Sequence, residues 1–328
     1  MEATDSGGLV AMNDTRHFAG RFALGAALVL AVLLAGVPPA NGQLAGSDQP
    51  VPVLLPATSP IPMVRIPIPI TQPWLNGLSS IHTTDGEQIL ALSNQGVLIQ
   101  GRLERDRAGR LTGVRWQGAQ ALGFGDGRPL TNGFRAAEGL AVAPDGRIFV
   151  SFEYHNRVWT YRQPGAPAED LGTHVDFGRL RHGRGLEALA LAPDGALYAI
   201  PERPARMTHG FPSYRWQNGQ WFGAFRMPAD GHFLPVSADF GPDGLLYVLE
   251  FSTGAGQGAQ TQIRRFPVQG DAMGRGTLVM RSAPGQFGRL SGLSVWRDRT
   301  GQLRATLISD NGSLADRSAE LVEMLLPR

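Results

Sequence analysis

The sequence predicts an all-β protein, a β-propeller of about five blades. Three observations carry this prediction: an apolar phrase that recurs on a fixed period, a Pro-Asp-Gly turn after that phrase, and a composition of 43 Gly and 24 Pro in 328 residues. Such a composition, with few long periodic apolar stretches, is typical of many short strands joined by turns. We expect little helix.

The repeat is clearest at Asp145, Asp194 and Asp243, with 49 positions from each aspartate to the next. Each aspartate follows a short apolar run and a proline and precedes a glycine. A period near fifty residues with this content is typical of a β-propeller, whose blades are four-stranded sheets around an axis.

Five units share an apolar strand, a turn and a second strand that ends in a polar residue. They span residues 76–94, 138–153, 187–202, 236–250 and 291–310. The residues between successive units carry weaker strand signals, enough for two outer strands each. Six blades is the alternative, because the spacing from Asn94 to Glu153 leaves room for an extra hairpin.

The ends of the chain predict how the ring closes. After Asp310 only one good strand remains, at residues 320–326, so the last blade lacks its outermost strand. Residues 63–70 read as a strand that is free to fill this place. Pro67 and Pro69 remove backbone donors from it, which confines it to the edge of a sheet.

The first residues resemble a secretory leader. Arg16 and Arg21 precede an apolar run of about 16 residues, and small residues follow at 38–42. We predict a signal peptide at 1–42, a Pro/Gly-rich linker at 43–62, a propeller domain at 63–328, and a periplasmic or secreted protein with no stable membrane span after cleavage. An uncleaved signal anchor is the alternative, because the run approaches the spanning length of ~20 residues.

The composition excludes several kinds of chemistry. There is no cysteine, so neither a disulfide nor a thiolate metal site exists. The 30 basic residues are all arginine, which excludes a Schiff-base lysine and a P-loop lysine. The sequence pI is about 9.4, but the formal charge is only +2 and the arginines are dispersed, so we expect no nucleic-acid partner. We also predict a monomer.

The polar residues of the repeats are predicted to meet on one face. In each unit the two strands are antiparallel neighbours, so the start of the first and the end of the second lie at the same end of the sheet. The predicted metal ligands are Asn94, Glu138, Glu153, Glu187, Glu202, Glu250 and Asp310. Like charges at such close range oppose each other's ionisation, so a compensating cation is expected. Carboxylates with an amide oxygen suit Ca²⁺.

Arginines near these positions are the other source of positive charge. Arg135 and Arg184 each stand three residues before a repeat glutamate, Arg203 follows Glu202, and Arg289 stands two residues before Ser291. We assign catalysis to Glu187, Glu138 and Arg184, with Glu187 as general base, and ligand binding to Arg135, Arg203 and His155. The structural alternative is that strand-end glutamates only accept backbone N–H bonds and pair with an arginine of the next unit. The Pro-Asp-Gly turns are assigned a structural role.

These residues also carry a resemblance over Asn76–Pro327. The chain resembles the bacterial phytase-like family, described by an esterase-like activity of phytase. The matching segments are Gly77-Leu-Ser, Ile89–Gly96, Ala137–Ala141, Gly185–Ala190, Leu246–Glu250, Gly292–Trp296 and Leu307–Asn311. The family pattern has Ser-Asp-Arg-Gly where this chain has Ser93-Asn94-Gln95-Gly96, and Glu-Gly where it has Ser291-Gly292. Two negative charges are therefore missing from the predicted set.

The resemblance implies an exported propeller that hydrolyses a phosphoester or a carboxylester. We predict that a carboxylate-bound Ca²⁺ polarises a small anionic ester and lowers the pKa of a water molecule. Two alternatives remain open at this point. One is a non-catalytic propeller that binds a ligand or partner on the same face, and the other is a metal-dependent lactonase.

Overall fold

Antiparallel sheets make up the part of the chain that the structure describes, which is residues 61–181, 183–203, 210–254, 258–310 and 319–327 of a computed structural model. All of these residues belong to the unit Val51–Arg328. The predicted signal peptide and the linker up to residue 60 lie outside the described residues. Within the described ranges, no helix has the length and apolarity needed to span a bilayer.

Five sheets form five blades, each named here by its order along the chain. Blades 1 and 2 contain β2 (Leu78–His82), β3 (Gln88–Ser93), β4 (Val97–Arg105), β5 (Leu111–Ala121), β6 (Ala137–Val142), β7 (Ile148–Phe152), β8 (Arg157–Tyr161) and β9 (Glu169–Asp170). Blade 3 contains β10 (Leu186–Leu191), β11 (Leu197–Pro201), β12 (Phe211–Gln217) and β13 (Gln220–Met227).

The remaining blades follow the same order. Blade 4 contains β14 (Leu234–Phe240), β15 (Leu245–Ser252), β16 (Gln260–Gln269), β17 (Ala272–Met273) and β18 (Thr277–Arg281). Blade 5 contains β19 (Arg289–Arg297), β20 (Leu303–Asp310), β21 (Ala319–Leu325) and β1 (Met63–Ile68). Two short 3₁₀ turns, Pro73–Leu75 and Phe177–Arg179, complete the described elements.

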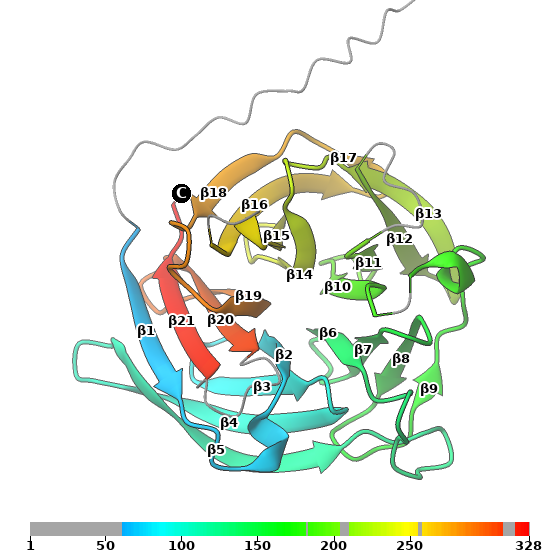
Figure 1. The fold of residues 1–328 in the computed structure, drawn as a ribbon, viewed down its shortest axis with the longest axis horizontal. Coiled ribbons are helices and arrows are strands. Elements are labelled where there is room, and N and C mark those ends of the chain that lie inside the picture. The colour runs from blue at the N-terminus through cyan, green and yellow to red at the C-terminus, as the bar shows by residue number, and fades with distance from the viewer. Residues whose placement is uncertain (1–60, 182, 204–209, 255–257, 311–318, 328) are drawn as a thin grey trace, which may run out of the picture. The chain divides into compact units, whose positions relative to one another are not determined.

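The prediction of five blades is confirmed, and the six-blade alternative is wrong. Strands β4 and β5 are nine and eleven residues long, and they fill the space between Asn94 and Glu153 that an extra hairpin would need. Figure 1 shows the five sheets around a centre, with β2, β6, β10, β14 and β19 innermost.

The predicted closure of the ring is confirmed. Strand β1 pairs antiparallel with β21, from Met63 opposite Met324 to Ile68 opposite Ala319, and it is the outermost strand of its sheet. Pro67 therefore lies on an edge, where its missing N–H leaves no gap in the ladder. The Ile68 side chain is only 1% exposed and packs with Leu78 and Leu321 in the core between blades 5 and 1.

Each pair of neighbouring blades shares one apolar core, so five such cores surround the axis. Side chains alternate along each inner strand, so the two faces of a strand serve different cores. Ala188 and Ala190 pack towards blade 4, whereas Leu186 and Leu189 pack towards blade 2. Burial of both faces holds the inner strands in fixed positions around the axis.

Serine hydroxyls also join neighbouring blades, each bonding a carbonyl of an inner strand. The Ser79 hydroxyl donates to the Ala137 carbonyl at 2.7 Å, Ser151 donates to Leu186 at 2.8 Å, and Ser291 donates to Leu78 at 2.8 Å. A hydrogen bond of this kind contributes about 1 kcal/mol. These bonds fix the ends of the inner strands where the repeat glutamates lie.

The Pro-Asp-Gly turns occupy the other end of the inner strands. Gly146, Gly195 and Gly244 have φ between +79° and +87°, a region that side chains disfavour. The aspartate before each glycine accepts a backbone N–H two residues on, as Asp145 does from Arg147 at 3.0 Å. This is the contact that an Asp-Gly turn requires, in keeping with the structural role assigned from the sequence.

Removal of the closing strand tests the ring. Deleting residues 61–68 should lower the free energy of unfolding by about 2 kcal/mol or more, because Ile68 leaves the core and the edge of β21 is exposed. The control lacks residues 1–60 only, and its unfolding midpoint in urea should equal that of the full chain. Equal unfolding midpoints for the two truncated proteins, followed by tryptophan fluorescence, would contradict the closure.

Candidate functional site

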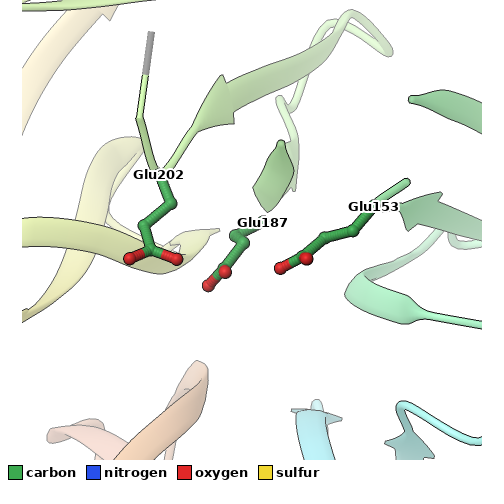
Figure 2. A group of neighbouring side chains, drawn as sticks. All are labelled: Glu153, Glu187 and Glu202. Carbon is green, nitrogen blue, oxygen red and sulfur yellow. The ribbon is translucent and has the colours of Figure 1, made fainter. Parts of the chain in front are cut away.

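Three buried glutamates from blades 2 and 3 form a cluster at the end of the inner strands opposite the Asp-Gly turns. Glu153 follows β7, Glu187 lies in β10 and Glu202 follows β11. They are 7%, 2% and 2% exposed, and one carboxylate oxygen from each lies within 4.8 Å of the others. Figure 2 shows the three side chains next to one another, with their carboxyl groups at the same end. We call these residues the carboxylate cluster.

A β-bulge places Glu187 in this cluster. Leu186 pairs with Pro201 and Ala188 pairs with Ile200, so Glu187 is the extra residue of β10. The other four inner strands shift register at the same end, for example between Leu290 and Gly292 in β19. A bulge turns a side chain away from the regular pleat, and bulges are common beside active sites.

Two hydrogen bonds to blade 2 hold the backbone of Leu186, the residue before Glu187. The Leu186 N–H donates to Asn156 Oδ1 at 3.2 Å, and the Leu186 carbonyl accepts the Ser151 hydroxyl at 2.8 Å. The backbones at Glu153 and Glu202 are also fixed, because their N–H groups donate to Ala136 and Gly185 at 2.9 Å. The cluster is therefore held in place by the backbone of two blades.

Three arginines lie against the carboxylate cluster. Arg184 Nη1 is 2.5 Å from Glu202 Oε1, and Arg203 Nε is 4.0 Å from the same oxygen. Arg289 is the first residue of β19 in blade 5, and its Nη2 is 3.4 Å from Glu187 Oε2 and 3.9 Å from Glu202 Oε2. The side chains of Arg184, Arg203 and Arg289 are 46%, 43% and 36% exposed. Positive charge therefore faces solvent, whereas negative charge is buried.

The close contacts shift the pKa values of two glutamates in opposite directions. The pKa of Glu187 lies well above its usual value because burial disfavours its charge, and the hydrogen bonds with Glu202 and Glu153 and the charge of Glu138 act the same way. Burial alone would raise the pKa of Glu202, but the hydrogen bond from Glu187 and the charges of Arg289 and Arg184 outweigh it and lower this pKa. In the absence of a cation, these opposite shifts favour a proton on Glu187 and the negative charge on Glu202.

The carboxylate cluster fits a divalent cation. When Glu187 and Glu202 are both ionised, the buried Glu202 Oε2 has no hydrogen-bond partner among the described residues. Arg289 Nη2, at 3.9 Å, is too far from that oxygen for a hydrogen bond, whereas a proton on Glu187 or a cation could serve it. Oxygens within 4.8 Å of one another can lie on a single coordination sphere, since Ca²⁺ binds oxygen at about 2.3–2.6 Å.

The other predicted metal ligands lie in different surroundings. Glu138 is half-buried, and its charge acts on Glu187, so it borders the cluster. Glu250 is fully buried, but Arg264 binds both of its oxygens at 2.6 Å and Gln262 donates to it at 2.9 Å. Asn94 Oδ1 accepts a hydrogen bond from the Gln95 amide. The side chain of Asp310 lies outside the described residues.

Two predicted ligand-binding residues contact groups other than the carboxylate cluster. Arg135 is exposed, donates to the Leu130 carbonyl at 2.8 Å and lines a separate cavity of about 350 Å³ beside Trp74. The His155 ring stacks on Phe134 at 4.4 Å. The roles assigned to these residues stay predictions.

The part played by Arg289 was not assigned from the sequence. Its position before Ser291 marked it as a nearby cation, but the repeat pattern does not show that it reaches glutamates of blade 3 from blade 5. Tyr154, next to Glu153, is another residue that the sequence did not single out. It is 51% exposed and has φ of +58°, which is rare for a residue with a side chain and was invisible in the sequence.

Comparison with known families gives one match. Residues 73–313 match the phytase-like family, described as having the esterase-like activity of phytase. The match includes the carboxylate cluster and all three arginines. No curated protein matches the chain.

Solved structures of similar fold have low sequence identity to this chain. The catalytic domain of the GH62 α-L-arabinofuranosidase from Coprinopsis cinerea has 12% identity and a TM-score of 0.47, and the alignment covers 81% of this chain and 97% of that one. A protein of unknown function from Dyadobacter fermentans has 10% identity, a TM-score of 0.45, and coverage of 80% and 98%. A gluconolactonase from Xanthomonas campestris has 15% identity, a TM-score of 0.38, and coverage of 84% and 100%. At these values we draw no functional argument from them.

Removing one charge from the cluster should stabilise the cation-free protein. With chelator present, Glu187→Gln should raise the melting temperature, because the amide keeps a donor for Glu202 and removes the cost of ionising a buried carboxyl. The raised pKa of Glu187 makes that cost grow as pH rises, so the gain should be larger at pH 8 than at pH 5.

The matched control is Glu250→Gln, which makes the same chemical change. It should lower the free energy of unfolding by about 3–5 kcal/mol, because the buried Arg264 loses its charged partner. Equal destabilisation by both substitutions, measured by thermal unfolding, would show that the carboxylate cluster is not a site of repulsion.

Proposed function

The chain belongs to the phytase-like family, and from this premise we propose that it is an exported hydrolase of small anionic esters, with phosphomonoesters as the first class to test. It would use a divalent cation, Ca²⁺, held by Glu153, Glu187 and Glu202. The observation that carries the proposal is the buried carboxylate cluster with one unpartnered oxygen, bordered on the solvent side by arginines.

The arrangement of charge supports an anionic substrate. Three carboxylates alone would repel a phosphate, but a bound dication offsets most of their charge. Arg184 and Arg289 then present guanidinium groups that suit phosphate oxygens, since arginine binds such groups through two parallel hydrogen bonds. Arg203 extends this positive border. A neutral ester would gain less from the three arginines than an anionic one.

Each residue has a proposed task. Glu153, Glu187 and Glu202 hold the cation, which when bound polarises the ester and makes a nearby water molecule more acidic. Arg184 and Arg289 orient the substrate. Glu138, half-buried beside Glu187, is the proposed general base towards that water molecule. It takes the place of Glu187, the base expected from the sequence, because Glu187 is deeply buried and closely bound to other carboxylates.

Export remains part of the proposal. Its support is the order of basic, apolar and small residues in the first 42 positions. Protein recovered from the cell envelope should begin near residue 43 by mass spectrometry. Recovery of the intact chain from the membrane would favour the signal anchor instead.

Cation binding and hydrolysis should depend on the same glutamates. At a hundredfold excess over its Kd, Ca²⁺ should stabilise the protein by about 2.7 kcal/mol, because it binds only the folded state. Glu202→Gln should abolish both this effect and the hydrolysis of p-nitrophenyl phosphate. Glu169→Gln, the same change at an exposed position of β9, is the control and should leave both intact.

The outcomes separate the alternatives. A Ca²⁺ effect with no hydrolysis of aryl phosphates, aryl acetates or lactones would replace the enzyme with a ligand-binding propeller. Hydrolysis of lactones alone would identify a lactonase. If Glu202→Gln keeps both the Ca²⁺ effect and the activity, the carboxylate cluster is not the site.

A further inference from the structure

A second cavity lies at the other end of the inner strands. It has a volume of about 580 Å³ and is lined by residues of all five blades, including His82, Arg147, Trp216, Asp239 and Trp296. None of the residues of the carboxylate cluster lines it. The carboxylate cluster and this cavity lie at opposite ends of β10: Glu187 is the second residue of the strand, and Leu191, its last residue, lines the cavity. A volume of this size suits a small organic ligand.

Asp239 gives this cavity an unbalanced charge. Its Oδ2 accepts the Val295 N–H at 2.7 Å and is 3.4 Å from the Ser294 hydroxyl. No ion pair within the described residues includes Asp239, and no cationic group contributes to its pKa, which burial raises to about 7. Neutral donors, the Val295 N–H, the Ser294 hydroxyl and the Phe240 N–H, thus fix a carboxylate that has no counter-ion among the described residues.

The other titratable groups of the cavity do not supply that counter-ion. Arg147 is 3.1 Å from Asp145, so these two charges offset each other. Burial lowers the pKa of His82 to about 4, so this ring is neutral near pH 7. With Asp239 ionised, the charges around the cavity therefore sum to −1.

The cavity walls favour an organic cation over a hydrated metal ion. Four aromatic side chains, Phe149, Trp216, Phe240 and Trp296, contribute to the lining. Arg147 lies over Phe149 and Arg105 over Trp296, whereas Trp216 and Phe240 have no cationic partner among the described residues. Aromatic faces attract cations, and a single carboxylate supplies too few oxygens for Ca²⁺.

We propose that this cavity binds a small organic monocation, a primary ammonium carried on an apolar or aromatic body, with the Asp239 carboxylate as its counter-ion. The ammonium bonds the Asp239 carboxylate, and the body of the ligand packs on Trp216 and Phe240. This site is separate from the carboxylate cluster and does not depend on the proposed hydrolase.

Benzylamine and benzyl alcohol provide matched probes, because they have the same ring and differ in charge. Titration calorimetry on the Ca²⁺-saturated protein at pH 8 should show benzylamine binding at least about tenfold more tightly than benzyl alcohol, the scale of one charge-assisted contact of about 1.4 kcal/mol. The preference should shrink at pH 6, where Asp239 takes up a proton.

Two variants locate the binding. Asp239→Asn keeps an acceptor for the Val295 N–H and should abolish the preference, with its unfolding temperature showing that the fold is kept. Glu202→Gln should leave the preference unchanged, which separates this cavity from the carboxylate cluster. The proposal is overturned if benzylamine and benzyl alcohol bind equally, if benzylamine does not bind at 10 mM, or if the preference persists in Asp239→Asn.

Discussion

Closure of five sheets around one axis is the constraint on which the rest of this structure depends. Inner strands from neighbouring blades must approach so closely that side chains at some positions are excluded. A Cβ on Gly139 would lie 2.6 Å from the Glu187 carbonyl oxygen, and one on Gly292 would lie 2.7 Å from the Ser80 Cα. The Glu-Gly and Ser-Gly pairs of the repeats are therefore requirements of close packing, and the polar residue before each glycine is carried to the axis with it.

The same closure accounts for the chemistry of the carboxylate cluster. Burial between blades 2 and 3 removes Glu153, Glu187 and Glu202 from water and brings their oxygens together, so their charges cannot all persist without compensation. The three arginines reach only part of the cluster, and Glu202 Oε2 is left to a proton or a cation. Competition between a proton and a cation for one buried oxygen is how this fold would couple metal binding to pH.

The sequence was sufficient for the fold because each blade repeats its own local signals. The Asp-Gly turns, the even spacing and the unpaired last blade predicted the blade count and the pairing of β1 with β21. The grouping of Glu153, Glu187 and Glu202 at one end followed from antiparallel pairing alone. Local patterns do not show which long side chain meets which carboxylate. Glu250 matched the pattern as well as Glu202 did, yet Arg264 of the next strand binds it, and Arg289 reaches the cluster from blade 5. Asp239 was also missed, since its unbalanced charge depends on all five blades.

Anomalous diffraction from crystals of the mature protein grown with Mn²⁺, which shares the preference of Ca²⁺ for oxygen ligands, tests the central claim most directly. The account predicts one strong peak within about 2.0–2.6 Å of an oxygen from each of Glu153, Glu187 and Glu202. A map with no peak there, in which Glu187 and Glu202 remain in direct contact, would show that a shared proton balances the cluster and would contradict the metal site.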